Sequence, residues 1–191
     1  MNLDKIVIIK KATSLEELLK RHATVSQVRF FLESRKQSFE FYRSAHETYA
    51  EGLQKIINAV PIGMRMQVVD KEYLPTFQFG EKDLAVIVGD DGLVVNAAKY
   101  IGAQPVISVN PDEKRNDGVL SCCSTATFPK KLKNTVEGNA SIETLTMAEA
   151  KLDDGQILYA LNDFFIGKNT HTSARYHIAY AGKKEYQSSD G

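Results

Sequence analysis

Leu84-Ala85-Val86-Ile87-Val88-Gly89-Asp90-Asp91-Gly92 is the stretch of sequence that decides the fold. Its first five residues are apolar without alternation, which is typical of a strand buried on both faces inside a helix-covered sheet. Two acids between two glycines then predict a tight turn, and a helix is predicted from about Leu93 to Ile101. In a parallel sheet, a strand followed by such a turn and a helix brings a ligand to the carboxyl ends of the strands.

Three further apolar runs predict strands of the same sheet, at Lys5–Lys10, Met66–Val69 and Pro105–Val109. Between the first two runs the apolar spacing is helical, first around Leu15–Leu19 and then over about Val25–Val60, with a possible break near Ser34–Ser38. The resulting order of strands and helices predicts an α/β fold with a Rossmann-like, largely parallel sheet.

The pattern changes after about Gly118. A short helix is predicted at Phe128–Val136, and turn signals separate three later runs that are typical of antiparallel strands, at Ser141–Leu152, Gln156–Gly167 and Ala174–Ala181. We therefore predict two domains. Residues 1–118 form an α/β nucleotide-binding domain that contains the Gly-Asp-Asp-Gly motif, and residues 119–191 form a β-rich domain.

The composition argues against several classes of function. Lys and Arg number 24, as do Asp and Glu, and the basic residues are spread along the chain, so no nucleic-acid partner is expected. No apolar run approaches the roughly 18 residues of a membrane span, so no membrane partner is expected either. The adjacent Cys122 and Cys123 would form a disulfide only with strain. We interpret them as free thiols of a cytoplasmic protein and predict no metal site.

The turn at Gly89–Gly92 has two physical interpretations. Backbone N–H groups of the turn and of the helix N-terminus suit a phosphate, and a carboxylate beside them can accept a proton from a sugar hydroxyl or lie near Mg²⁺. The alternative is an N-capping aspartate followed by a turn aspartate, with no ligand. The segment is neither a Gly-x-Gly-x-x-Gly fingerprint nor a P-loop.

The segment resembles the Gly-Gly-Asp-Gly-Thr motif of NAD kinases, which diacylglycerol kinases, sphingosine kinases and phosphofructokinase share in similar form. Asn96–Tyr100 and Val109–Leu120 are similar to the continuation in a bacterial branch labelled sugar kinase or NAD kinase-like. Asn162-Asp163 is similar to the second motif of the family, usually Asn-Glu, and Ser188–Gly191 resembles the start of a third region.

This resemblance implies transfer of a phosphoryl group from ATP, with Mg²⁺, to the 2′-hydroxyl of the adenosine ribose of NAD, which gives NADP. It implies that Asp91 is the catalytic residue that orients or deprotonates this hydroxyl. It also implies a homo-oligomer, because members of the family are commonly oligomers. The implied nucleotide-binding residues are those of the three motifs, namely Gly89, Asp90, Gly92, Leu93, Asn162, Asp163 and Asp190.

Two cationic sites are phosphate candidates on chemical grounds. Arg175 can pair with a phosphate through two N–H groups, and Lys10 and Lys11 follow a strand whose carboxyl end lies at the ligand edge of the sheet.

Three residues depart from the family pattern. Asp90 stands in place of Gly, Leu93 in place of Thr, and Asp163 in place of Glu. The β domain of the family also continues beyond the position that Gly191 matches, so we expect this domain to be incomplete here and the 191-residue chain to have little kinase activity alone. Two alternatives stay open: a weak or inactive dinucleotide-binding relative, and a lipid or sugar kinase that shares the motif.

Overall fold

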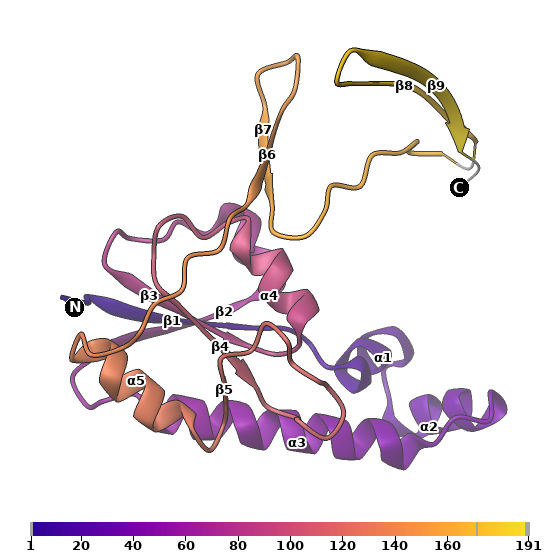
Figure 1. Ribbon diagram of the computed structural model, residues 1–191. Coiled ribbons are helices and arrows are strands. Elements are labelled where there is room, and N and C mark those ends of the chain that lie inside the picture. Colours follow the sequence, from indigo (N-terminus) through magenta and orange to yellow (C-terminus); the bar gives the residue numbers. More distant parts are fainter. Residues whose placement is uncertain (1, 171, 190–191) are drawn as a thin grey trace. The chain divides into compact units, whose positions relative to one another are not determined.

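A computed structural model describes residues 2–170 and 172–189 (Figure 1). The chain divides into two compact units, Met1–Leu161 and Asn162–Gly191, and each is described by itself. The first unit contains a five-stranded sheet with strand order β2-β1-β3-β4-β5, in which every pairing is parallel. Its strands are β1 (Lys5–Lys10), β2 (Arg65–Asp70), β3 (Asp83–Val88), β4 (Val106–Asn110) and β5 (Cys123–Ser124). The predicted α/β class with a parallel sheet is confirmed.

The two inner strands β1 and β3 owe their position to apolar residues on both faces. Ile6–Ile9 are fully buried, and every residue of β3 is buried. Alternate residues of these strands feed two separate cores, since successive side chains point to opposite faces of a sheet. One core also contains Ile56, Phe128 and Leu132, and the other contains Leu74, Leu93 and Ala97.

Helices cover the two faces of the sheet accordingly (Figure 1). α3 (Phe39–Asn58) and α5 (Phe128–Val136) contribute to the first core, whereas α4 (Asp91–Ala98) and the 3-10 helix η1 (Lys71–Thr76) contribute to the second. α5 has the predicted bounds, and α4 begins and ends slightly earlier than predicted. Residues after the predicted domain boundary near Gly118 thus still belong to the sheet and its layers, and that boundary stays a prediction.

The long helical segment is interrupted where the sequence allowed a break. α2 (Val25–Ser34) ends before Arg35, and α3 begins after Ser38, whose hydroxyl caps the backbone N–H of Phe41. The preceding helix α1 (Ser14–His22) begins with a capping box between Thr13 and Glu16. These three helices share a small core of their own, made of Leu15, Val28, Leu32 and Phe39.

The remaining strands form two antiparallel hairpins. β6 (Ala148–Lys151) pairs with β7 (Ile157–Ala160) in the first unit, and β8 (Ala174–Tyr180) pairs with β9 (Lys183–Ser189) in the second. The predicted strands at 141–152 and 156–167 are therefore too long. Pairing extends only from Ala148 opposite Ala160 to Lys151 opposite Ile157, and β-propensity alone does not create a strand where no partner lies opposite.

Candidate functional site

The motif turn lies at the carboxyl edge of the sheet, directly after β3. Val88 ends the strand, Gly89 and Asp90 form the turn, and α4 begins at Asp91. A Cβ atom on Gly89 would lie 2.9 Å from Cδ2 of Leu93, so the glycine allows α4 to pack closely on the sheet. Leu93 itself is only 1% exposed and belongs to the core, which explains an apolar residue at this position.

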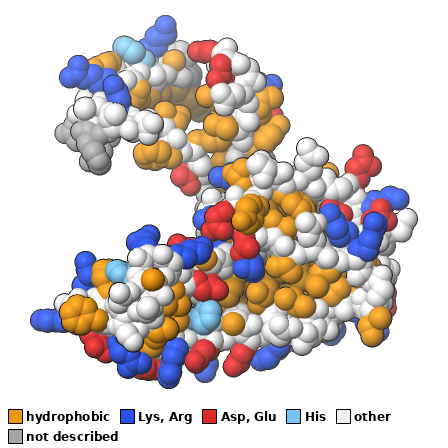
Figure 2. Space-filling model, turned by 180° about the vertical axis from the view of Figure 1, so that it is seen from behind, with side chains coloured by type: hydrophobic (Ala, Val, Ile, Leu, Met, Phe, Trp, Pro, Cys, Tyr) orange, Lys and Arg blue, Asp and Glu red, His pale blue; other side chains and the backbone are white. Residues whose placement is uncertain are grey.

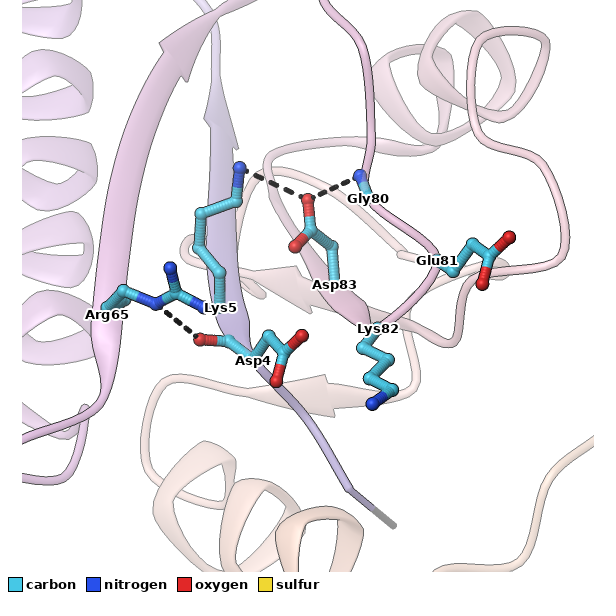
Figure 3. Close-up of a pocket in the computed structure, with 7 residues that line it drawn as sticks. All are labelled: Asp4, Lys5, Arg65, Gly80, Glu81, Lys82 and Asp83. Atoms are coloured by element: carbon cyan, nitrogen blue, oxygen red, sulfur yellow. Dashed lines mark hydrogen bonds and ion pairs between the residues drawn. The ribbon is translucent and has the colours of Figure 1, made fainter.

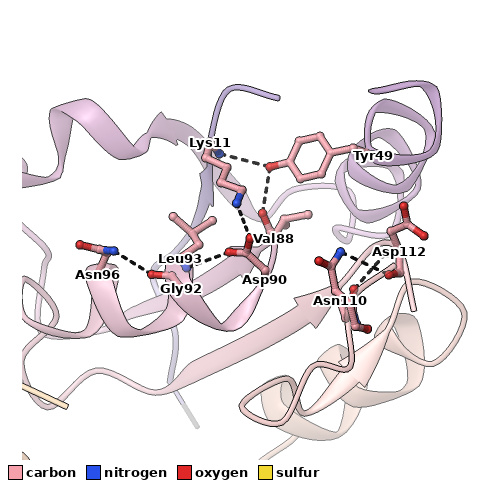
Figure 4. A network of polar contacts seen from close by, with 10 residues as sticks. Lys11, Tyr49, Val88, Asp90, Gly92, Leu93, Asn96, Asn110 and Asp112 are labelled. Carbon is pink, nitrogen blue, oxygen red and sulfur yellow. Dashed lines mark hydrogen bonds and ion pairs between the residues drawn. The ribbon is translucent and has the colours of Figure 1, made fainter. Parts of the chain in front are cut away.

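Asp90 is the N-cap of α4 and also an ion-pair partner (Figure 4). Its Oδ1 accepts the backbone N–H of Leu93 at 3.1 Å, and its Oδ2 pairs with Nζ of Lys11. Burial opposes ionisation of this carboxyl, but the hydrogen bond and charge of Lys11 and the backbone N–H of Leu93 outweigh it and lower the pKa of Asp90. The structure therefore contains the N-cap that one interpretation of this turn predicted.

Asp91 holds a loop that is distant in sequence. Its two carboxylate oxygens accept the backbone N–H groups of Val119 at 2.8 Å and of Leu120 at 2.9 Å. The loop between β4 and β5 reaches this position through Gly118, whose φ of +68° is a left-handed conformation suited to glycine. The predicted catalytic carboxylate is thus fixed by backbone N–H groups of a segment that resembles the continuation of the NAD kinase motif.

The start of the same loop is fixed by Asn110, a residue only 3% exposed at the end of β4. Its side-chain amide donates to the carbonyl of Asn116 at 2.8 Å, and its amide oxygen accepts the N–H of Asp112 at 3.0 Å (Figure 4). Asp112 in turn pairs with Arg115 at 2.6 Å. The Asn-Pro-Asp sequence signalled a turn here but gave no indication of this buried polar network.

Tyr49 of α3 lies beside the motif turn, which the sequence did not predict. Its helical spacing indicated only a core position or an interface. Its hydroxyl donates to the carbonyl of Val88 at 2.9 Å and accepts the N–H of Lys11 at 3.2 Å (Figure 4). Burial raises the pKa of Tyr49 to about 12. The phenol therefore ties the ends of β1 and β3 together beside the motif turn.

The remaining predicted site residues are placed as follows. Lys10 pairs with Asp70 at the end of β2. Asn162 and Asp163 are exposed at the start of the second unit, and Arg175 is exposed on β8 of that unit. Asp190 lies outside the described residues. The structure thus brings together Gly89–Leu93 and Lys11, and a ligand role for the other residues stays a prediction.

A cavity of about 390 Å³ lies at the opposite, amino edge of the sheet (Figure 3). Three of its lining residues, Lys5, Arg65 and Asp83, are the first residues of β1, β2 and β3. Lys5 and Asp83 pair at 3.2 Å, and the N–H of Gly80 donates to Asp83 at 2.9 Å. Because Lys5 and Asp83 already pair with each other and ligands of open α/β sheets bind at the carboxyl edge, this cavity is the weaker candidate.

Within the described part of the chain, no cluster of three or more His, Cys, Asp or Glu side chains is arranged to hold a metal ion. None of the helices described in the structure combines the length and hydrophobicity that crossing a bilayer requires.

The fold and site thus define an α/β protein with a turn of glycines and acids at the carboxyl edge of its parallel sheet. No protein-family model matches the chain. A segment of 88 residues is 32% identical to an NAD kinase of Chlorobaculum tepidum. The matched segment covers 46% of this chain and only 30% of that relative. The match indicates a distant, partial relationship to a kinase.

Proposed function

We propose that the chain is an NAD kinase-like phosphotransferase, which transfers a phosphoryl group from ATP to the adenosine 2′-hydroxyl of NAD. The observation that carries the proposal is the Gly89–Gly92 turn between β3 and α4 at the carboxyl edge of the sheet. The partial similarity to an NAD kinase supports it. Catalysis of this reaction class consists mainly of positioning and charge neutralisation, which a rigid turn can supply.

Asp91 is the proposed catalytic residue. Each of its oxygens accepts one backbone N–H, from Val119 and from Leu120. A carboxylate has about four lone-pair sites in total, so it retains acceptor capacity for a ribose hydroxyl. The two N–H donors fix the direction of the remaining lone pairs, and Asp91 would thereby orient the hydroxyl and accept its proton.

Mg²⁺ would enter with the phosphates of ATP. This ion commonly uses one or two protein carboxylates together with substrate phosphates and water, so a three-residue protein cluster is not required. Asp91 accepts only backbone N–H groups and has spare lone pairs for such a role, whereas Asp90 already has a cation, the ammonium of Lys11, at one of its oxygens.

Formation of NADP from NAD and Mg²⁺-ATP tests the proposal. Asp91→Asn is expected to lower the rate at least about 100-fold, the usual range for loss of a general base. Asp153→Asn makes the same chemical change at an exposed hairpin turn and is the matched control. Equal rates for wild type and Asp91→Asn would refute the role of Asp91, and the absence of NAD binding to the folded wild type would refute the proposal as a whole.

One observation favours a second function, a dinucleotide-binding protein with little turnover. The Asp90 carboxylate occupies the N-terminus of α4, where the N–H of Leu93 and the ammonium of Lys11 would otherwise face a phosphate. Under this alternative, NAD binds but no NADP forms, and Asp90→Gly tightens binding because it removes the competing anion. Unchanged NAD affinity in Asp90→Gly would contradict it.

A further inference from the structure

Cys122 and Cys123 direct their sulfur atoms to one place, although they are adjacent in sequence. The carbonyl of Ser108 accepts from Sγ of Cys122 at 3.3 Å and from Sγ of Cys123 at 3.7 Å. When Cys122 is ionised, the thiol of Cys123 donates to its sulfur instead. Successive side chains of a regular strand point to opposite faces, so this convergence depends on Cys122 lying just before β5.

The pair has one reactive member that solvent can reach. Cys122 is exposed, whereas Cys123 is partly buried. The hydrogen bond from Cys123 stabilises the thiolate of Cys122 against the opposing effect of burial, and contacts with Ser108 and the charge of Lys131 add to it, so the pKa of Cys122 falls to about 6. The same hydrogen bond raises the pKa of Cys123. Cys122 is therefore the first nucleophile and Cys123 the second.

The geometry limits what the pair can bind. A direct disulfide between adjacent cysteines is strained, but a larger atom placed between the two sulfurs enlarges the ring and relieves that strain. The described residues provide no third His, Cys, Asp or Glu ligand beside the sulfurs. An atom that fits this site therefore bonds to the two protein sulfurs and brings its third substituent with it.

We propose that Cys122 and Cys123 form a two-sulfur site for a trivalent, thiophilic metalloid with one organic substituent, such as an organoarsenical. With an arsine oxide, two As–S bonds form while the As=O bond and two S–H bonds break. The oxygen leaves as water with both thiol protons, and arsenic stays trivalent, so no oxidant is needed. This inference does not rest on the proposed kinase function.

Occupation of the pair also acts on Asp91. The hydroxyl of Ser108 accepts the N–H of Cys122 at 3.0 Å and donates to the carbonyl of Leu120 at 2.5 Å. The N–H of Leu120 in turn donates to Asp91. A bridge between the sulfurs therefore pulls on the segment whose two N–H groups hold the carboxylate.

Intact-protein mass spectrometry with phenylarsine oxide tests the site. The chain has only two cysteines, so any two-thiol adduct within one chain must involve this pair. We expect one adduct per chain, with the mass of the reagent less one water. It should survive excess mercaptoethanol, a monothiol, and be removed by dimercaptopropanol, a dithiol. Loss of the wild-type adduct in mercaptoethanol would overturn the proposal.

Two controls separate a bridge from attachment to one sulfur. Cys122→Ser and Cys123→Ser should each lose the adduct in mercaptoethanol, and retention in either variant would overturn the proposal. A control without substitution is wild type alkylated at Cys122 near neutral pH, which should form no stable adduct. A stable adduct on that alkylated chain would equally overturn the two-sulfur site.

Hydrogen exchange tests the link to Asp91. In the adduct, the amides of Val119 and Leu120 should exchange several-fold faster, while the amide of Ile87 in β3 should not change. Unchanged exchange at Val119 and Leu120 in a chain that carries the adduct would refute the link.

Discussion

β3 and β8 have nearly equal lengths, six and seven residues, but opposite environments. All of β3 is buried between two helical layers, whereas most residues of β8 are exposed in a two-stranded hairpin. An isolated two-stranded hairpin has little to stabilise it beyond its ladder of hydrogen bonds. The comparison teaches that the sheet holds Asp91 in a rigid frame. Arg175, by contrast, lies on a hairpin whose residues are mostly exposed, so its position is less firmly fixed.

The β6–β7 hairpin resembles the β8–β9 hairpin, because both have exposed apolar side chains, among them Ile178 and Tyr180 of β8. Ile157, Leu158 and Tyr159 are exposed, and hydrophobic side chains are visible at the surface in the space-filling view (Figure 2). Apolar sequence therefore builds a core only where a second layer faces it.

The sharpest test of this comparison is the loss of one phenylalanine from each region. Phe128→Ala empties a position that is fully buried under the sheet and should cost about 3–5 kcal/mol of unfolding free energy. Phe165→Ala in the second unit, at a position 91% exposed, should change it by less than about 0.5 kcal/mol. Urea denaturation measures both values. Equal midpoints for the two variants would break the comparison.

Two glycines with positive φ allow a second, smaller test. Substitution by alanine at Gly118 (φ +68°) or at Gly182 (φ +78°) should lower the free energy of unfolding by about 1–2 kcal/mol, from backbone strain alone. At Gly118 the new Cβ would also lie 2.7 Å from the side-chain nitrogen of Asn110, whereas nothing lies within 4 Å at Gly182. Gly118→Ala should therefore be the more destabilising by about 1 kcal/mol or more. Equal losses of stability for the two variants in thermal denaturation would show that the loop around Gly118 shifts and relieves the clash.

Tyr49→Phe removes the hydroxyl that joins β1 and β3, and should cost about 1–2 kcal/mol below pH 10. The folded pKa is raised from 10.0 to about 12, so the neutral phenol stabilises the fold fully below pH 10 and loses this contribution as pH rises toward 12. The stability difference between wild type and Tyr49→Phe should shrink over that range. Tyr180→Phe, at a site 81% exposed, is the control. A constant difference would contradict the burial of this hydroxyl.

The smallest effect concerns one ion pair in each region. Asp90→Asn keeps a good N-cap but removes the charge opposite Lys11, and should cost less than about 1 kcal/mol. Because the pKa of Asp90 is lowered from 3.8, the ionic contribution is present above pH 4 and is lost as pH falls through the folded value. Glu149→Gln, which breaks an exposed pair with Lys151 in β6, should have no measurable effect. Melting curves at neutral and acidic pH distinguish these outcomes. A cost for Asp90→Asn that persists in acid would point to lost capping instead.

The fold was predictable because its main signals are local. The unbroken apolar runs in β1 and β3 and the helical spacing of α3 each require only neighbouring residues to be read. The strands β6 and β7 were predicted at excessive length, since a strand ends where its partner ends. Pairing between β6 and β7 is a property of two segments and of no single one.

The site was predictable in its position but not in its contacts. The turn after β3 follows from the sequence, whereas capping and ligand binding at Asp90 both stayed open until the structure showed the cap. The hydrogen bonds of Asp91 to Val119 and Leu120 join residues 28 and 29 positions apart. Tyr49 meets Val88 across 39 positions. No local pattern encodes such distances, because they depend on how the loops close over the sheet.

The two hydrogen bonds that Asp91 accepts also bear on how this position can evolve. An aspartate that closes a loop is under selection for the fold itself, whether or not it acts on a substrate. A descendant that had lost all turnover would therefore still be penalised for replacing it, and one that regained a ligand would find the carboxylate already in place. Replacement of this acid would consequently carry a cost in folding that is separate from any cost in turnover.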